Sequence, residues 1–110
     1  MPFDTKNESN HLVVSVDEAR LDASIAENFK DYLFNHIDQD ASDMVIDLSV
    51  VRFMDSSGLG VLVSALKKMD GKSKIKLAGA QPAVLDLFHL TSMDKLFSIL
   101  PTVTEAIEEK

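Results

Sequence analysis

Residues 55–58 place a carboxylate, two hydroxyl groups and a glycine inside an otherwise apolar passage. Phe53 and Met54 precede this polar joint, which reads Asp55-Ser56-Ser57-Gly58, and Leu59 follows it. Four kinds of chemistry use such residues where a helix begins: capping of the helix, catalysis by a serine, phosphate binding by a loop, and phosphorylation of a serine. The neighbouring residues discriminate among the four.

A catalytic serine is not supported by the residues around the joint. The nucleophile elbow of hydrolases is Gly-x-Ser-x-Gly, and neither Ser56 nor Ser57 has a glycine two positions before it. A serine hydrolase also needs a histidine base, and no recognisable pattern relates the serines to the three histidines, which are His11, His36 and His89. We therefore expect that the protein is not an enzyme.

A phosphate-binding loop has weak support. Gly58 and Gly60 form a G-x-G pair, but the third glycine of the dinucleotide fingerprint is absent, and so is the Gly-Lys-Ser/Thr of a P-loop. We interpret the two glycines as residues that allow a helix to pack closely against a sheet. A small-ligand or nucleotide-binding sensor module stays as the alternative function.

Two interpretations of the polar joint remain open on these residues alone. A helix cap would contribute about 1 kcal/mol by accepting hydrogen bonds from exposed backbone N–H groups. A phosphoacceptor serine also suits a helix start, because free N–H groups and the positive end of the helix dipole favour a phosphate there. Such a phosphate would add about −1.5 to −2 charges beside Asp55, enough to weaken the docking of a partner.

The first half of the chain predicts two strands and a helix before the joint. Residues 11–16 alternate between apolar and other positions as a strand does, and a short edge strand is expected near Phe3. Apolar residues recur every four positions over 22–37, with Asp22 or Ser24 as the cap, which predicts a helix. The apolar run over 44–48 predicts a central strand buried on both faces.

The second half continues the alternation of helices and strands. A helix is expected from Leu59 to Met69 with Gly71 as its stop, and then a strand at 75–77, a helix from Pro82, a strand over 97–100 and a final helix after Pro101. This order predicts an α/β fold with a mostly parallel or mixed sheet of four to five strands and about four helices packed against it. With 110 residues, we expect a single domain over 1–110.

The composition narrows the possible partners. The chain carries 18 acidic and 11 basic residues, and its net charge of −7 repels nucleic acid and anionic lipid. It has no cysteine, no apolar run of about 18 residues free of charge, and no secretory signal pattern. We expect a cytoplasmic protein that uses no cofactor or metal and binds neither nucleic acid nor membranes.

The joint and its flanks resemble the hallmark of one family. Residues 45–48, Val-Ile-Asp-Leu, and 53–62, Phe-Met-Asp-Ser-Ser-Gly-Leu-Gly-Val-Leu, are similar to the STAS-domain anti-sigma factor antagonists of bacterial partner-switch systems. The resemblance covers about residues 10–108 and includes Arg20-Leu21-Asp22, residues 76–79 followed by Pro82, Leu90-Thr91, and Glu105-Ala106. We therefore expect the fold to be that of a single STAS domain.

The resemblance implies how such a protein works. In its unphosphorylated form it would bind a serine kinase/anti-sigma protein of the histidine-kinase-like ATPase type, and phosphorylation of Ser56 would end that binding. A PP2C-like phosphatase would remove the phosphate, and the free protein is expected to be a monomer. The implied output is transcription through a sigma factor, or another response such as polysaccharide and biofilm production or secretion.

The resemblance also implies roles for individual residues. Asp55, Ser57 and Gly58 would shape the loop around the phosphoacceptor, and Ser57 is expected to be the helix cap. The partner would contact four residues: Leu21, Asp22, Ser56 and Leu59.

Overall fold

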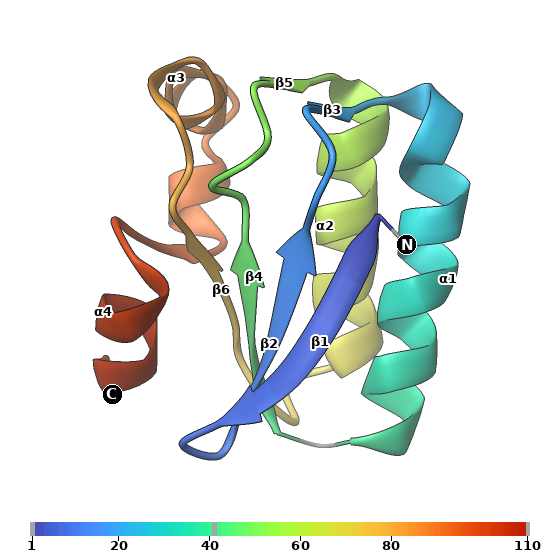
Figure 1. Cartoon of the computed structure of the whole chain (residues 1–110), viewed down its shortest axis with the longest axis vertical. Coiled ribbons are helices and arrows are strands. Elements are labelled where there is room, and N and C mark those ends of the chain that lie inside the picture. Colours follow the sequence, from blue (N-terminus) through green and yellow to red (C-terminus); the bar gives the residue numbers. More distant parts are fainter. Residues whose placement is uncertain (1, 41, 110) are drawn as a thin grey trace.

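The computed structural model describes residues 2–40 and 42–109, which fold around a five-stranded sheet (Figure 1). The strand order is β1-β2-β4-β6-β7. β1 pairs antiparallel with β2, and the other neighbours pair in parallel. The bounds are β1 (Phe3–Glu8), β2 (His11–Val16), β4 (Asp43–Asp47), β6 (Ile75–Ala78) and β7 (Ser98–Leu100).

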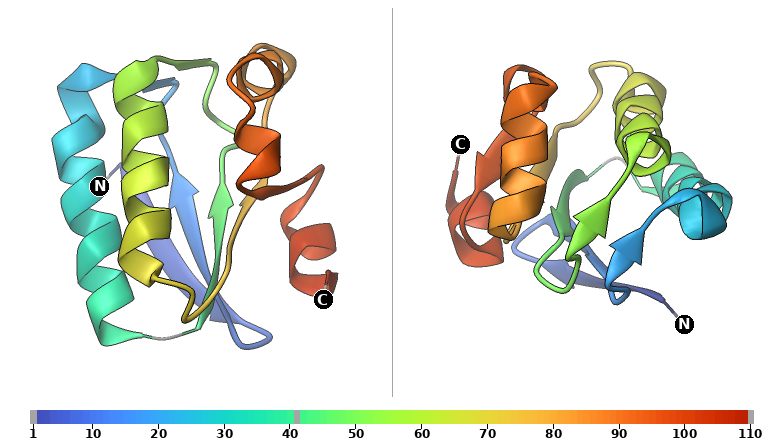
Figure 2. Two further views of the ribbon diagram at one scale, coloured as in Figure 1. Left: turned by 180° about the vertical axis from the view of Figure 1, so that it is seen from behind. Right: turned by 90° about the horizontal axis from the view of Figure 1, so that it is seen from above.

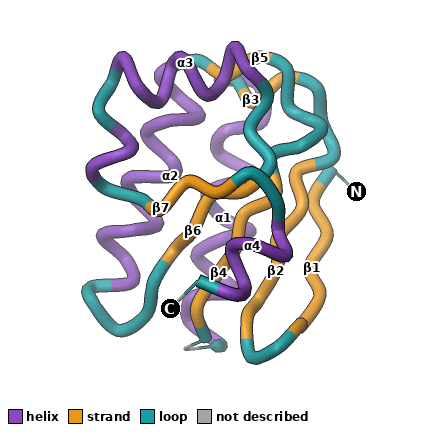
Figure 3. The backbone as a smooth tube through the Cα atoms, turned by 90° about the vertical axis from the view of Figure 1, so that its left-hand side faces the viewer, coloured by secondary structure: helices purple, strands orange, loops and turns teal. Residues whose placement is uncertain are grey.

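Helices cover both faces of this sheet. They are α1 (Ala23–Gln39), α2 (Ser56–Met69), α3 (Pro82–Leu90) and α4 (Val103–Glu108), and a short 3-10 helix η1 (Met93–Lys95) follows α3. α1 and α2 lie side by side on one face (Figure 2). α4 lies on the opposite face, in front of the strands when α1 and α2 are behind them (Figure 3). The predicted α/β fold, a mixed sheet with four helices, is therefore confirmed.

Alternation along the strands produces two separate cores. On the α1 and α2 side, strand residues such as Val14, Ile46 and Leu77 pack against helix residues such as Phe29 and Leu62, and all five are fully buried. The neighbouring strand positions point the other way. There, the smaller core under α4 consists of Val13, Val45, Ala78 and Ala106.

A second, two-stranded sheet is not expected from the sequence pattern. β3 (Arg20–Leu21) pairs in parallel with β5 (Phe53–Met54), with Arg20 opposite Phe53 and Leu21 opposite Met54. It lies beyond the ends of β2 and β4, at the end of the molecule where α1 and α2 begin (Figure 1). Strands of two residues are too short for any periodicity to be detected.

Two predicted boundaries are corrected by the structure, and one is confirmed. The strand near Phe3 is six residues long and spans β1. α2 begins at Ser56 rather than Leu59, because its cap is Asp55. The same helix ends at Met69, as expected, and both Asp70, its C-cap, and Gly71 have left-handed backbone, with φ of 51° and 76°.

The two glycines after the serines have different surroundings. A Cβ atom on Gly58 would lie 2.7 Å from the Leu21 carbonyl oxygen and 2.9 Å from the Met54 Cγ atom. A Cβ atom on Gly60 would meet nothing within 4 Å. Close packing of α2 against the small β3–β5 sheet therefore needs glycine at position 58, and the packing role expected for Gly60 is wrong.

Alanine substitutions at the two glycines should have opposite effects. We expect Gly58→Ala to lower the free energy of unfolding by about 1–3 kcal/mol, because the backbone of Leu21 must move. Gly60→Ala is the matched control and should raise it by about 0.5–1 kcal/mol, since alanine is the better helix former. Urea unfolding followed by circular dichroism measures both, and equal stability of the two variants would contradict the packing argument.

Candidate functional site

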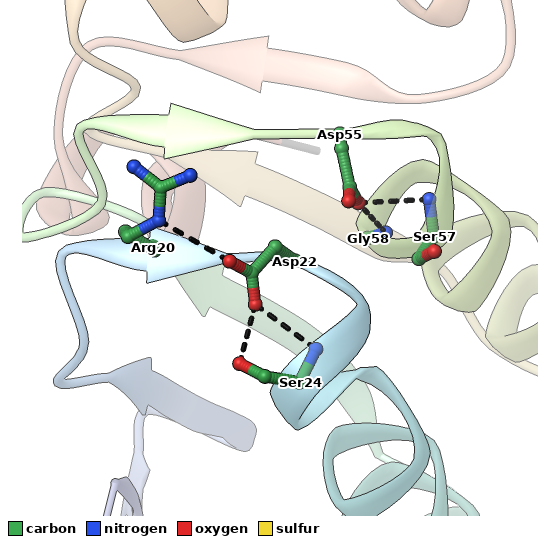
Figure 4. A network of polar contacts seen from close by, with 6 residues as sticks. All are labelled: Arg20, Asp22, Ser24, Asp55, Ser57 and Gly58. Atoms are coloured by element: carbon green, nitrogen blue, oxygen red, sulfur yellow. Dashed lines mark hydrogen bonds and ion pairs between the residues drawn. The ribbon is translucent and has the colours of Figure 1, made fainter.

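Two joints between a strand and a helix lie next to each other in this fold. β3 leads through Asp22 into α1, and β5 leads through Asp55 into α2. Because β3 and β5 pair in register, the two aspartates occupy equivalent places on neighbouring chain segments (Figure 4). The first turns of α1 and α2 therefore begin side by side at one end of the molecule.

Asp55 is the cap of α2. Its Oδ1 atom accepts hydrogen bonds from the backbone N–H groups of Ser57, at 2.9 Å, and of Gly58, at 3.2 Å (Figure 4). Its own backbone N–H donates to the Leu21 carbonyl oxygen at 3.4 Å, which ties the joint to β3. The expectation that Ser57 caps the helix is therefore wrong: Ser57 supplies a backbone donor to the cap.

Ser56 differs from Ser57 in both exposure and bonding. It is the first residue of α2 and is exposed, whereas Ser57 is half-buried. Within residues 2–40 and 42–109, no hydrogen bond involves the Ser56 hydroxyl group, and Asp55 already accepts from the N–H groups of the two residues after Ser56. A reagent or partner can thus reach this hydroxyl without disturbing the helix start.

Asp22 is the cap of α1 and is held by two neighbouring side chains. Its Oδ1 atom accepts from the Ser24 N–H at 3.0 Å and from the Ser24 hydroxyl at 2.6 Å. Its Oδ2 atom accepts from the Arg20 Nε–H at 3.2 Å. These interactions lower the pKa of Asp22, chiefly through the hydroxyl of Ser24 and then its N–H, with a smaller contribution from Arg20. Asp22 is therefore an oriented carboxylate beside the start of α2.

Arg20 and Phe53 extend the site along β3 and β5. The Arg20 guanidinium lies over the Phe53 ring, 4.3 Å from its centroid, and Phe53 is 42% exposed. The only other arginine in the chain, Arg52, precedes Phe53 directly. A cavity of about 170 Å³ opens beside them, between β5 and α3, and is lined by Arg52, Phe53, Met54, Ala83, Val84 and Leu87.

Arg20 and Phe53 belong to this site but are not among the residues expected from the sequence. One signal could have found them. Residues 20–24, Arg-Leu-Asp-Ala-Ser, and 53–57, Phe-Met-Asp-Ser-Ser, share an apolar residue, an aspartate and a serine at the same spacing. The two words mark two equivalent joints, in which Ala23 of α1 stands where Ser56 stands in α2.

Two of the residues expected to contact a partner are less accessible than Ser56. Leu21 is fully buried against Gly58, so the expectation that its side chain contacts a partner is wrong. Leu59 is half-buried and packs against the main core. Both support the joint from the core side. Asp22 is half-buried as well, with 20% of its side chain exposed, so Ser56 is the one exposed residue among the four expected contacts.

The described residues contain neither a metal-binding cluster nor a membrane-spanning helix. Among residues 2–40 and 42–109, no group of three or more histidine, aspartate or glutamate side chains is placed to hold a metal ion. No helix in that part of the chain is long and apolar enough to cross a membrane. Gly58 faces Leu21 and Met54, so the G-x-G pair does not form a cradle for a phosphate.

Known proteins are similar to this chain in sequence and in fold. The model of the STAS domain family matches residues 2–106. An anti-sigma-B factor antagonist from Listeria monocytogenes is 30% identical over 95 residues, which are 86% of this chain and 82% of that protein. The crystal structure of an anti-sigma factor antagonist from Mycobacterium paratuberculosis has a TM-score of 0.87 and 28% identity, and covers 96% of this chain and 90% of that one.

A more distant structure has the same fold. The Bacillus cell fate determinant SpoIIAA in its phosphorylated form has a TM-score of 0.72 at 19% identity, with 96% of each chain covered. Together, the match over residues 2–106 and the 30% identity with an antagonist establish the relationship. The chain belongs to the STAS domain family, among relatives that are anti-sigma factor antagonists.

Proposed function

We propose that this protein is a partner-switch regulator of the anti-sigma factor antagonist type, controlled by phosphorylation of Ser56. The observation that carries the proposal is the contrast between the two serines. Ser56 is exposed and its hydroxyl has no partner within the described residues, while the N–H of Ser57 is engaged in the cap. A kinase can therefore modify Ser56 without first opening the helix.

The proposed partners follow from the relatives. The name of the anti-sigma-B factor antagonist says that it opposes an anti-sigma factor. The structure of SpoIIAA is known in its unphosphorylated and its phosphorylated form. We propose that this chain binds a serine kinase/anti-sigma protein of the histidine-kinase-like ATPase type, and that a PP2C-like phosphatase reverses the modification. The chain itself would catalyse nothing and would act as a monomer in the cytoplasm, where the kinase finds ATP.

Electrostatics supports a switch at this position. Asp55 precedes Ser56 directly, and Asp22 occupies the equivalent place on the neighbouring joint. A phosphate of about −1.5 to −2 charges would add to these two carboxylates on one small surface. A partner shaped to bind the Ser56 hydroxyl and Asp22 would then face like charges or bury the phosphate without a counter-charge. Either costs several kcal/mol of binding free energy at an interface. Phosphorylation would then release the partner.

A nucleotide-binding sensor module is the alternative, and no observation in the described residues favours it. The glycine that would approach a phosphate, Gly58, is packed against Leu21 and Met54. Saturable binding of ATP or GTP by the purified chain at micromolar concentration, without a protein partner, would support the alternative and weaken the proposal.

Phosphorylation should occur once and at Ser56. We expect that incubation of the purified chain with its cognate serine kinase and ATP adds one phosphate, measured by intact mass. Ser56→Ala should abolish the addition, because the exposed hydroxyl is lost. Ser57→Ala is the matched control and should still be modified, since its backbone N–H continues to serve the cap. A phosphate that persists in Ser56→Ala would contradict the site assignment.

Charge at position 56 should control binding to the kinase. We expect Ser56→Asp to weaken binding by about tenfold or more relative to Ser56→Ala, because the new carboxylate lies beside Asp55 and Asp22. The enzymatically phosphorylated chain, which carries more charge, should bind more weakly still. Isothermal titration calorimetry with the cognate kinase and a non-hydrolysable ATP analogue measures all three, and equal affinities would refute the electrostatic mechanism.

A further inference from the structure

Lys76 is the one charged side chain that is buried among residues 2–40 and 42–109, with 1% of its surface exposed. It lies in β6, between Ile75 and Leu77. The alternation of the sequence groups it with Lys74, which is exposed. A buried ammonium group costs free energy unless it is paired or hydrogen-bonded, so the burial of Lys76 requires hydrogen-bond partners in the fold.

The ammonium group of Lys76 binds the end of α4. Its Nζ atom donates to the carbonyl oxygen of Ala106 at 2.9 Å and to that of Glu109 at 2.7 Å. The last carbonyl groups of a helix have no partner within the helix, and a cation there also interacts favourably with the helix dipole. Lys76 therefore caps α4 from another element, through charge-assisted hydrogen bonds.

α4 depends on these contacts because it is too short to be stable alone. It has six residues, from Val103 to Glu108, and an isolated helix needs roughly twice that length in water. Apart from the Lys76 bonds, α4 is held by Ala106, which is fully buried against Val13, Val45 and Ala78, and by Val103 and Ile107, which are partly buried against the same core. It follows Pro101 near the carboxyl end of the chain and lies alone on its face of the sheet (Figure 3).

We infer that α4 opens and closes as a unit, independently of the main core, and that Lys76 is the lock that holds it closed. Opening breaks two hydrogen bonds and uncovers an apolar strip of Val13, Val45 and Ala78. The strip lies on the sheet face opposite α1 and α2, so Ser56 and the β3–β5 sheet stay in place. The inference is independent of the proposed function and concerns a different part of the molecule.

Thiol labelling can measure this opening, because the chain has no cysteine of its own. Ala78→Cys places a thiol under α4, and Ala65→Cys places one in the main core, between α2 and the sheet. Both alanines are fully buried, so the two substitutions are matched. Reaction with Ellman's reagent under native conditions reports how often each site becomes accessible, and urea unfolding checks that the two variants are equally stable.

The two thiols should differ in their labelling rates. We expect the thiol of Ala78→Cys to react about tenfold faster, or more, than the thiol of Ala65→Cys, because local opening needs less free energy than global unfolding. Equal rates at equal stability would overturn the inference that α4 opens separately.

The lock is tested by adding Lys76→Met to each cysteine variant. The loss of bonds from a charged donor should speed labelling under α4 by about tenfold and leave labelling in the main core unchanged. Lys74→Met, at the exposed lysine two residues earlier, is the control and should change neither rate. Labelling under α4 that is unchanged in Lys76→Met would overturn the lock. If Lys76→Met fails to fold, Lys76→Gln, which keeps an N–H donor without the charge, should give a smaller acceleration at the same site.

Discussion

The cap that Asp55 makes on α2 is the interaction on which the geometry of the site depends. One carboxylate oxygen accepts from two backbone N–H groups, those of Ser57 and Gly58. The bonds fix where the helix starts and leave the hydroxyl group of the preceding serine without a role in the fold. The first turn of α2 also requires Gly58, since only a residue without a side chain lets this turn approach the Leu21 carbonyl so closely. Asp55 thus stabilises the start of the helix, while the adjacent Ser56 stays accessible.

The pairing of β3 with β5 places the cap of α2 next to the cap of α1 on one surface of the molecule. Two short strands carry two aspartates into the same region, and each aspartate starts a helix. Asp22 and Asp55 thereby bring negative charge close to Ser56, while Arg20 bonds Asp22 and lies over Phe53. A phosphate on Ser56 would add negative charge to a surface that holds two carboxylates and the guanidinium group of Arg20.

The two faces of the sheet are stabilised to different degrees. α1 and α2 are 17 and 14 residues long and cover the main core, so neither relies on a single polar contact. α4 has six residues and covers a smaller core, with four buried side chains and three partly buried ones, and the buried Lys76 bonds its last carbonyl groups. The site at the polar joint belongs to the well-packed side.

The sequence by itself determined the α/β order, the main strands and helices, and the position of the polar joint. Hydrophobic periodicity is a local property, and the runs around Phe29, Ile46 and Leu62 are long enough for it to be detected. The motif at residues 53–62 also sufficed to indicate the family, which the match over residues 2–106 established. Only the tertiary structure decided which residue caps α2, that Asp22 lies beside Asp55, and that Lys76 is buried. A cap depends on which N–H groups a side chain reaches, so three adjacent polar residues could not be separated by type alone. Asp22 and Asp55 lie side by side because β3 and β5 pair, and strands of two residues carry no periodic signal. The alternation of β6 assigns Lys76 to one face, but whether that face meets water depends on α4, which is distant in sequence and docks there only in the folded chain.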